Sequence, residues 1–122
     1  MAATIHSVIP FIPAGPDIQA AIDFYTRVLG FVVRWNAGSL VCVGRDTADL
    51  ILQQIDDKHT ASQLMLQITV RDVDALAAEY ALRDFSPGRL GKLEVKPWGN
   101  REMHVIDHYG VCLHFTELHS VP

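Results

Sequence analysis

Six histidines are the residues of this chain best suited to metal or acid–base chemistry: His6, His59, His104, His108, His114 and His119. His104 and His108 have the spacing of two helical metal ligands, but the alternation around them predicts a strand and its turn, where they cannot share a face in that way. If residues 107–110 form a four-residue turn, Met103 opposes His114 across the hairpin. A site of Glu102, His104 and His114 would then need a bulge or a different register. We therefore expect no metal ion and no other cofactor.

The sequence also contains no recognisable arrangement of residues for nucleophilic catalysis. Ser7, Ser39 and Ser86 lack a strand–turn–helix elbow, and no Gly-rich phosphate loop is present. The two cysteines, Cys42 and Cys112, stand in apolar, strand-like surroundings without an activating neighbour. We interpret them as small buried hydrophobic residues of a reducing compartment. Binding is the chemistry that remains.

Composition limits the classes of protein to consider. The chain has 122 residues, 49% of them hydrophobic, and a net charge of −4. No Lys/Arg cluster indicates a nucleic-acid partner, and no apolar run has the length of a membrane span. Without a signal-peptide pattern, the expected location is the cytoplasm. An acidic surface would suit a cationic ligand.

The same order of elements occurs twice along the chain. Strands are predicted over residues 5–12, 31–35, 39–43 and 50–55, and again over 64–70, 93–95, 101–106 and 111–117. A helix follows the first strand of each set, capped by Asp17 and ended by Gly30 in the first, and capped by Asp72 in the second.

The two helix starts match at one constant offset. Asp17, Ile18, Ala20 and Tyr25 correspond to Asp72, Val73, Ala75 and Tyr80. We predict an α+β fold in which tandem βαβββ repeats form a curved half-barrel sheet with helices outside. Residues 1–122 would be a single domain of two modules, about 4–58 and 62–119. Such a sheet has a concave groove, the kind of surface that small-molecule sites favour.

Several motifs resemble those of the glyoxalase/bleomycin resistance family of the vicinal-oxygen-chelate superfamily. The hairpin reads Trp-Gly-x-Arg-Glu from Trp98, then Asp-x-x-Gly from Asp107, then an apolar strand. Phe24-Tyr25 followed by Leu29-Gly30-Phe31 is similar to the Phe-Tyr-x-x-x-Leu-Gly-Phe helix of the superfamily, and Pro10 and Pro13 are similar to the opening of the bleomycin-resistance branch. The resemblance covers most of the chain and implies the fold proposed above.

The resemblance also implies where metal-dependent members place their His, Gln or Glu ligands. Here those positions fall on the Val8–Pro10 stretch, on Met65 and on His114. Only His114 is a conventional ligand. The chain therefore resembles the metal-free, bleomycin-resistance-like branch more than the enzymes.

That branch implies a set of ligand-binding residues. Trp98 is expected to line the groove and to stack against flat heteroaromatic parts of a ligand. A second aromatic position falls near Leu40, with Trp35 as the closest aromatic residue. Glu102 either anchors a cationic ligand or pairs with Arg101. Three further residues are expected in the groove: Met65, Met103 and His114.

The first hypothesis is a homodimeric binder of a flat, possibly cationic antibiotic or toxin, acting by sequestration. The alternative is a metal-dependent lyase, isomerase or dioxygenase with rearranged ligands. A third hypothesis is a regulatory module whose groove is filled by Met65, Met103 and Trp98. The resemblance implies the dimer, in which halves of two chains complete each groove, and an open sheet edge makes such pairing physically reasonable.

Overall fold

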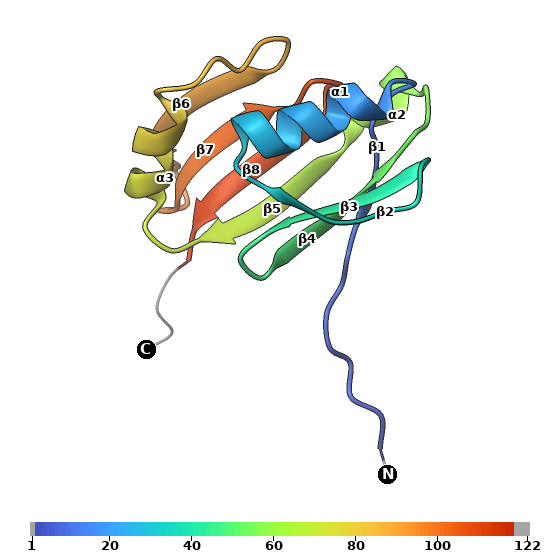
Figure 1. Cartoon of the computed structure of the whole chain (residues 1–122). Coiled ribbons are helices and arrows are strands. Elements are labelled where there is room, and N and C mark those ends of the chain that lie inside the picture. Colours follow the sequence, from blue (N-terminus) through green and yellow to red (C-terminus); the bar gives the residue numbers. More distant parts are fainter. Residues whose placement is uncertain (1, 119–122) are drawn as a thin grey trace.

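The computed structural model describes residues 2–118, which form two sheets and the helices beside them (Figure 1). The first half contains β1 (Phe11–Pro13), α1 (Ile18–Asp23), the π-helix η1 (Phe24–Val28), β2 (Val32–Asn36), β3 (Leu40–Arg45) and β4 (Ala48–Gln53). The second half contains α2 (Lys58–Gln63), β5 (Met65–Val70), α3 (Val73–Tyr80), β6 (Arg89–Val95), β7 (Arg101–Ile106) and β8 (Cys112–Glu117).

The two sheets have the same strand order. Each is four-stranded, in the order β1-β4-β3-β2 for the first half and β5-β8-β7-β6 for the second. In both, the first strand pairs in parallel with the last strand of its half, and the other pairings are antiparallel. The repeat predicted from the sequence, a strand, a helix and three strands, is confirmed.

The first helical segment, α1 followed by η1, begins and ends where the sequence predicts. The Asp17 side chain accepts a hydrogen bond from the Ala20 amide at 3.2 Å, which caps α1. The helix continues into the wider turns of η1 and stops before Gly30, which has φ +78°. Glycine adopts this left-handed conformation at little cost, so the chain can turn back into β2.

One hydrophobic core runs through both halves. Tyr80 of α3 donates a 2.8 Å hydrogen bond to the Leu29 carbonyl, at the end of the first-half helix. Burial raises the pKa of Tyr80 to about 12, so its hydroxyl remains a donor. Arg45, in the first half, pairs with both carboxylate oxygens of Glu79 at 2.8 Å. These contacts fix the second-half helix against the first half.

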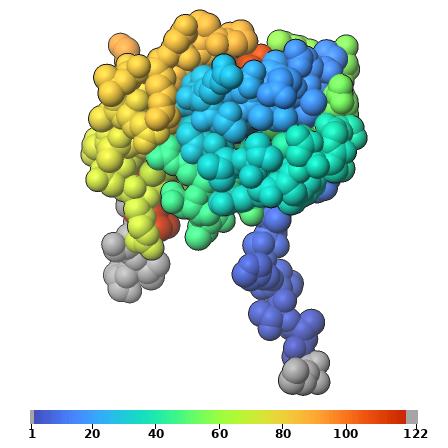
Figure 2. Space-filling view, in the orientation of Figure 1, coloured from blue at the N-terminus to red at the C-terminus, as the bar shows by residue number. Residues whose placement is uncertain are grey.

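Three elements differ from those predicted. The first strand begins at Phe11 rather than residue 5, and residues 2–10 leave the body as an extended, exposed arm (Figures 1 and 2). Ile5, Val8 and Ile9 favour a strand, but residues 5–9 pair with no other strand among residues 2–118. Helix α2 was not predicted, although Asp57 caps it by accepting from the Thr60 amide at 3.0 Å. Strand β6 begins at Arg89 rather than residue 93.

None of the helices among residues 2–118 is long and apolar enough to cross a membrane.

Candidate functional site

The turn between β7 and β8 is held by the buried Asp107. Its amide donates to the Val111 carbonyl at 2.8 Å, and its carboxylate Oδ1 accepts from the amides of Tyr109 and Val111 at 2.9 and 3.0 Å. The strands consequently pair from Ile106 opposite Cys112, and residues 107–111 form the connection. The turn is therefore one residue longer than predicted.

This register places His104, and not Met103, opposite His114. The predicted pairing of Met103 with His114 is wrong, because Asp107 and Val111 close the longer turn. Met103 instead pairs with Phe115 and is 1% exposed in the core, so it cannot line an open face as expected. Side chains alternate along each strand, so Glu102 and His104 lie on the face of β7 opposite to Met103.

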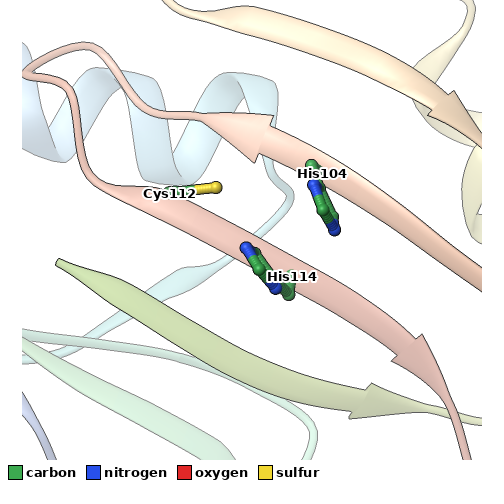
Figure 3. A group of neighbouring side chains, drawn as sticks. All are labelled: His104, Cys112 and His114. Carbon is green, nitrogen blue, oxygen red and sulfur yellow. The ribbon is translucent and has the colours of Figure 1, made fainter. Parts of the chain in front are cut away.

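On that face the two imidazole rings stack, with centroids 3.8 Å apart and planes 12° from parallel. Cys112 lies on the same face because it precedes His114 by two residues in β8. Figure 3 shows its thiol directed toward the two histidines. One ligand atom from each of the three residues lies within 4.8 Å of the others. The structure thus brings together groups that the predicted register had separated.

Glu102 is a buried carboxylate at one side of this cluster, 5% exposed. Its Oε2 accepts from the Trp98 indole Nε1–H at 2.8 Å, and its Oε1 lies 3.2 Å from Nε2 of His104 and 3.8 Å from Nδ1 of His114. Burial raises the pKa of Glu102, but the hydrogen bonds from His104 and Trp98 outweigh that effect and hold it below its usual value. The carboxylate is ionised at neutral pH.

The pairing of Glu102 with Arg101, one of the two predicted alternatives, does not occur. Arg101 instead forms ion pairs with Asp74 and with Glu117, the latter at 3.5 Å. Arg101 therefore does not neutralise the negative charge of Glu102, which lies next to the histidines.

The protonation states of the cluster follow from burial. Burial and the neighbouring His104 lower the pKa of His114, against the opposing charge of Glu102. Its imidazole is thus neutral at pH 7, with a lone pair available. Burial raises the pKa of the Cys112 thiol, which Arg89 opposes and Asp107 reinforces. The face presents the neutral imidazole of His114 and the neutral thiol of Cys112 next to one buried negative charge.

Trp98 and Met65 border this face and are largely open to solvent. Trp98 is 66% exposed although its indole N–H is held by Glu102. Met65 is 68% exposed and pairs with Cys112 across the parallel strands. Trp98 therefore combines a hydrogen-bonded indole with an accessible ring, and Met65 presents an accessible thioether.

Trp35 and Leu40 lie on the other sheet, on the face away from the core. Phe11, Ile51, Cys42 and Trp35 stand side by side across four strands, and Leu40 shares their face. Phe11 is 51% exposed and Trp35 44% exposed. This row of Phe11, Ile51, Cys42 and Trp35, here named the apolar row, has no sheet pairing with the histidine face among residues 2–118.

The sequence reasoning missed four residues of these faces. They are Phe11, Gln67, Cys112 and Thr116. Gln67 pairs with His114 and Thr116 with Glu102, so both belong to the histidine face. The Thr116 hydroxyl is buried and makes no hydrogen bond within the described part of the chain. Because side chains alternate along a strand, Cys112 and Thr116 could have been inferred from His114 two residues away. Gln67 and Phe11 could not, because their positions depend on the parallel pairing of β5 with β8 and of β1 with β4.

The metal positions implied by the resemblance do not form a site here. Val8 is 87% exposed in the extended arm, and Ile9 beside it is 40% exposed. Met65 offers a thioether next to Cys112, so His114 alone is a conventional donor among these positions. A metal ion of the enzyme branch does not fit this set.

A cavity of about 520 Å³ lies between the β3–β4 turn and α3. Arg45, Glu79 and Tyr80 are among its lining residues, and none of the seven predicted binding residues reaches it. The ion pair of Arg45 with Glu79 serves the contact between the halves. We therefore place the candidate site on the histidine face.

Comparison with known proteins shows the family to which this fold belongs. Residues 11–115 match the model of the Glyoxalase/Bleomycin resistance protein/Dioxygenase superfamily. A search of curated protein sequences finds no significant match.

Solved structures cover the chain almost completely. The bleomycin-binding protein of bleomycin-producing Streptomyces verticillus, solved with copper(II)-bleomycin, is 27% identical over 97% of this chain and 100% of its own, with a TM-score of 0.83. The bleomycin resistance determinant of transposon Tn5 is 20% identical over 95% and 100%, with a TM-score of 0.81. The antibiotic-binding protein TnmS3 from Streptomyces sp. CB03234 is 23% identical over 98% and 100%, with a TM-score of 0.74. This chain belongs to the Glyoxalase/Bleomycin resistance protein/Dioxygenase superfamily.

Proposed function

We propose that this protein binds a flat, cationic antibiotic or toxin on its histidine face and protects by sequestration, without chemical change. The observation that carries the proposal is Trp98, whose ring is 66% exposed while its N–H is fixed by the buried Glu102. The likeness to the Streptomyces verticillus protein, which binds copper(II)-bleomycin, supports this class of ligand.

Trp98 would supply stacking at a low entropic cost. An exposed aromatic ring normally loses rotational freedom when a ligand packs on it. Here the 2.8 Å hydrogen bond to Oε2 of Glu102 already restricts the indole. A flat heteroaromatic group stacked on the ring would gain about 0.5–1.5 kcal/mol beyond area burial.

Glu102 would supply the preference for cations. Its pKa is lowered and its side chain is buried, so a full negative charge lies behind the exposed surface at neutral pH. A charge in such a site is screened less by salt than an exposed one. The Thr116 hydroxyl, buried and without a hydrogen bond in the described chain, offers a polar contact on the same face.

A homodimer would complete the groove. The two ends of the apolar row, Phe11 and Trp35, are 51% and 44% exposed, and exposed large apolar side chains can mark an interaction surface. Ile5 and Val8 of the extended arm are 92% and 87% exposed and would also be buried by a second copy. Packing the apolar row of one chain over the histidine face of another would bring Trp35 and Leu40 to the same ligand as Trp98.

Sequestration requires no metal ion and no turnover, because bound drug is removed from solution by mass action. We place the protein in the cytoplasm, where its cysteines Cys42 and Cys112 stay reduced.

A calorimetric titration of the metal-depleted protein tests the proposal. Bleomycin and a panel of flat cationic compounds are the probes, and at least one should bind with a stoichiometry of one ligand per groove. Trp98→Ala removes the ring and should weaken that binding by at least about 2- to 13-fold, from the stacking energy lost. Leu82→Ala removes a side chain that is 88% exposed outside both faces and should leave binding unchanged.

Two outcomes would contradict the proposal. One is an absence of binding across the whole panel. The other is recovery of a chemically altered compound by mass spectrometry after incubation, which would indicate an enzyme of the superfamily instead. Sedimentation at several concentrations tests the dimer separately.

A further inference from the structure

The histidine face holds three donor side chains that binding of an organic ligand does not require. His104 and His114 are paired across β7 and β8, and Cys112 is on the same face of β8. One donor atom from each lies within 4.8 Å of the others, and all three residues are partly open to solvent (Figure 3).

We propose that His104, Cys112 and His114 bind a borderline divalent transition metal ion such as Zn²⁺ or Co²⁺, with at least one coordination position open to the groove. Imidazole and thiolate donors select this class of metal over Mg²⁺ or Ca²⁺. Three protein ligands with a free position characterise metal sites that accept an external ligand. The donors differ from the family positions, sharing only His114.

Glu102 determines which nitrogens are free. It faces Nε2 of His104 at 3.2 Å and Nδ1 of His114 at 3.8 Å. The nitrogens left for a metal are therefore Nδ1 of His104 and Nε2 of His114. A carboxylate bonded to the second nitrogen of a ligating histidine fixes the ring and increases its basicity. Glu102 is within hydrogen-bond distance of His104 for this purpose, while Nδ1 of His114 lies slightly farther from the same oxygen.

The donor separations are close to what a metal needs. In a tetrahedral site with Zn–N bonds of about 2.0–2.1 Å and a Zn–S bond of about 2.3 Å, two nitrogens lie about 3.3 Å apart and a nitrogen and a sulfur about 3.6 Å apart. The rings are 3.8 Å apart by their centroids, and all three donor atoms are within 4.8 Å. The two imidazoles would have to rotate out of their nearly parallel stack, so that their in-plane lone pairs converge on one point with the Cys112 sulfur, to complete a coordination shell.

Titration of the reduced, metal-depleted protein with Co²⁺ tests the site. One equivalent should produce a thiolate-to-cobalt charge-transfer band and the visible bands of tetrahedral Co²⁺, and Zn²⁺ should displace them. Cys112→Ser should abolish the charge-transfer band. His104→Ala and His114→Ala should each weaken binding by at least 10-fold, and Glu102→Gln should weaken it about 10- to 100-fold.

A histidine outside both faces provides a matched control. His59 lies in α2 and is exposed, so His59→Ala should leave the spectrum unchanged. A protein without the charge-transfer band at one equivalent, or a band that survives Cys112→Ser, would overturn the site. Because a variant can fail to fold, ¹H–¹⁵N imidazole spectra of the unmodified protein provide a second measurement. Zn²⁺ must shift the ring nitrogens of His104 and His114, and unchanged shifts would also overturn it.

The proposed drug binding does not depend on this metal, so the two proposals fail separately. A metal-depleted protein that binds the organic panel but not Co²⁺ contradicts the metal site alone. A protein that binds Co²⁺ but no compound of the panel contradicts the proposed function alone.

Discussion

The hydrogen bond from Tyr25 to Asp107 gives the sharpest test of how the histidine face is built. The Tyr25 hydroxyl donates to Oδ2 of Asp107 at 2.7 Å, and the residues are 0% and 1% exposed. The bond joins the first-half helix to the turn that sets the β7–β8 register. Burial first, and then the charge of Asp107, raise the pKa of Tyr25 well above its usual value, so the hydroxyl remains the donor at every accessible pH.

Tyr25→Phe removes this donor and keeps the ring. A buried hydrogen bond to a charged group contributes about 1.5–3 kcal/mol, so the free energy of unfolding should fall by that amount. The two amide bonds to Oδ1 of Asp107 remain, so the register should persist. Tyr109→Phe is the matched control, because the Tyr109 hydroxyl bonds Asp56, an exposed residue, at 2.8 Å and should contribute less than about 1 kcal/mol.

Urea unfolding followed by circular dichroism measures both variants. The protein concentration is held fixed because the proposed dimer would make stability depend on it. The midpoint should fall for Tyr25→Phe with an unchanged slope. A loss below about 0.5 kcal/mol, or one no larger than that of Tyr109→Phe, would refute the reasoning that the buried carboxylate needs this donor.

Two further predictions concern the contact between the halves and the strand beside the histidines. The hydrogen bonds from Arg45 lower the pKa of Glu79, against its burial, so Glu79 stabilises the fold above its unfolded pKa near 4.5 and loses this effect as pH falls through the lower folded pKa. Thermal unfolding of Glu79→Gln should therefore show a shallower loss of stability below pH 4.5 than the unmodified protein, and an identical slope would contradict the linkage. At Gly91 an added Cβ would lie 2.8 Å from the backbone oxygen of His104. Gly91→Ala should cost about 1–3 kcal/mol in urea unfolding and shift the His104 amide resonance, and a neutral substitution would show that β6 moves freely.

Local signals predicted most of the fold. Asp17 and Asp72 cap helices as the sequence indicates, each accepting from the amide three residues on. Gly30 ends the first helical segment with a positive φ. These features depend on residues within one turn of each other, so a single sequence contains the necessary information. The alternation of strand residues is an equally local signal, and both predicted ends of β7 are confirmed.

The features that could not be predicted depend on partners distant in sequence. Residues 5–9 include strand-forming Ile and Val but pair with no strand in the described chain, so their backbone gains no ladder. The register of β7 and β8 depends on one side chain, Asp107, which accepts two amides of the turn and the Tyr25 hydroxyl from 82 residues away. No pattern within the hairpin reveals that third contact.

That single residue of register changes the chemistry of the face. A one-residue slip exchanges the two faces of a strand, so a shorter turn would have placed Met103 beside His114 and turned Glu102 and His104 into the core. The observed register instead gives a buried charge, two imidazoles and a thiol on the second sheet, while the first sheet presents the apolar row. The two repeats thus share a fold but present different surfaces. If the proposed dimer brings these surfaces together, compounds with one flat apolar part for Trp35 and Trp98 and one cationic or metal-binding part for Glu102 and the histidines should bind more tightly than compounds with only one of these parts.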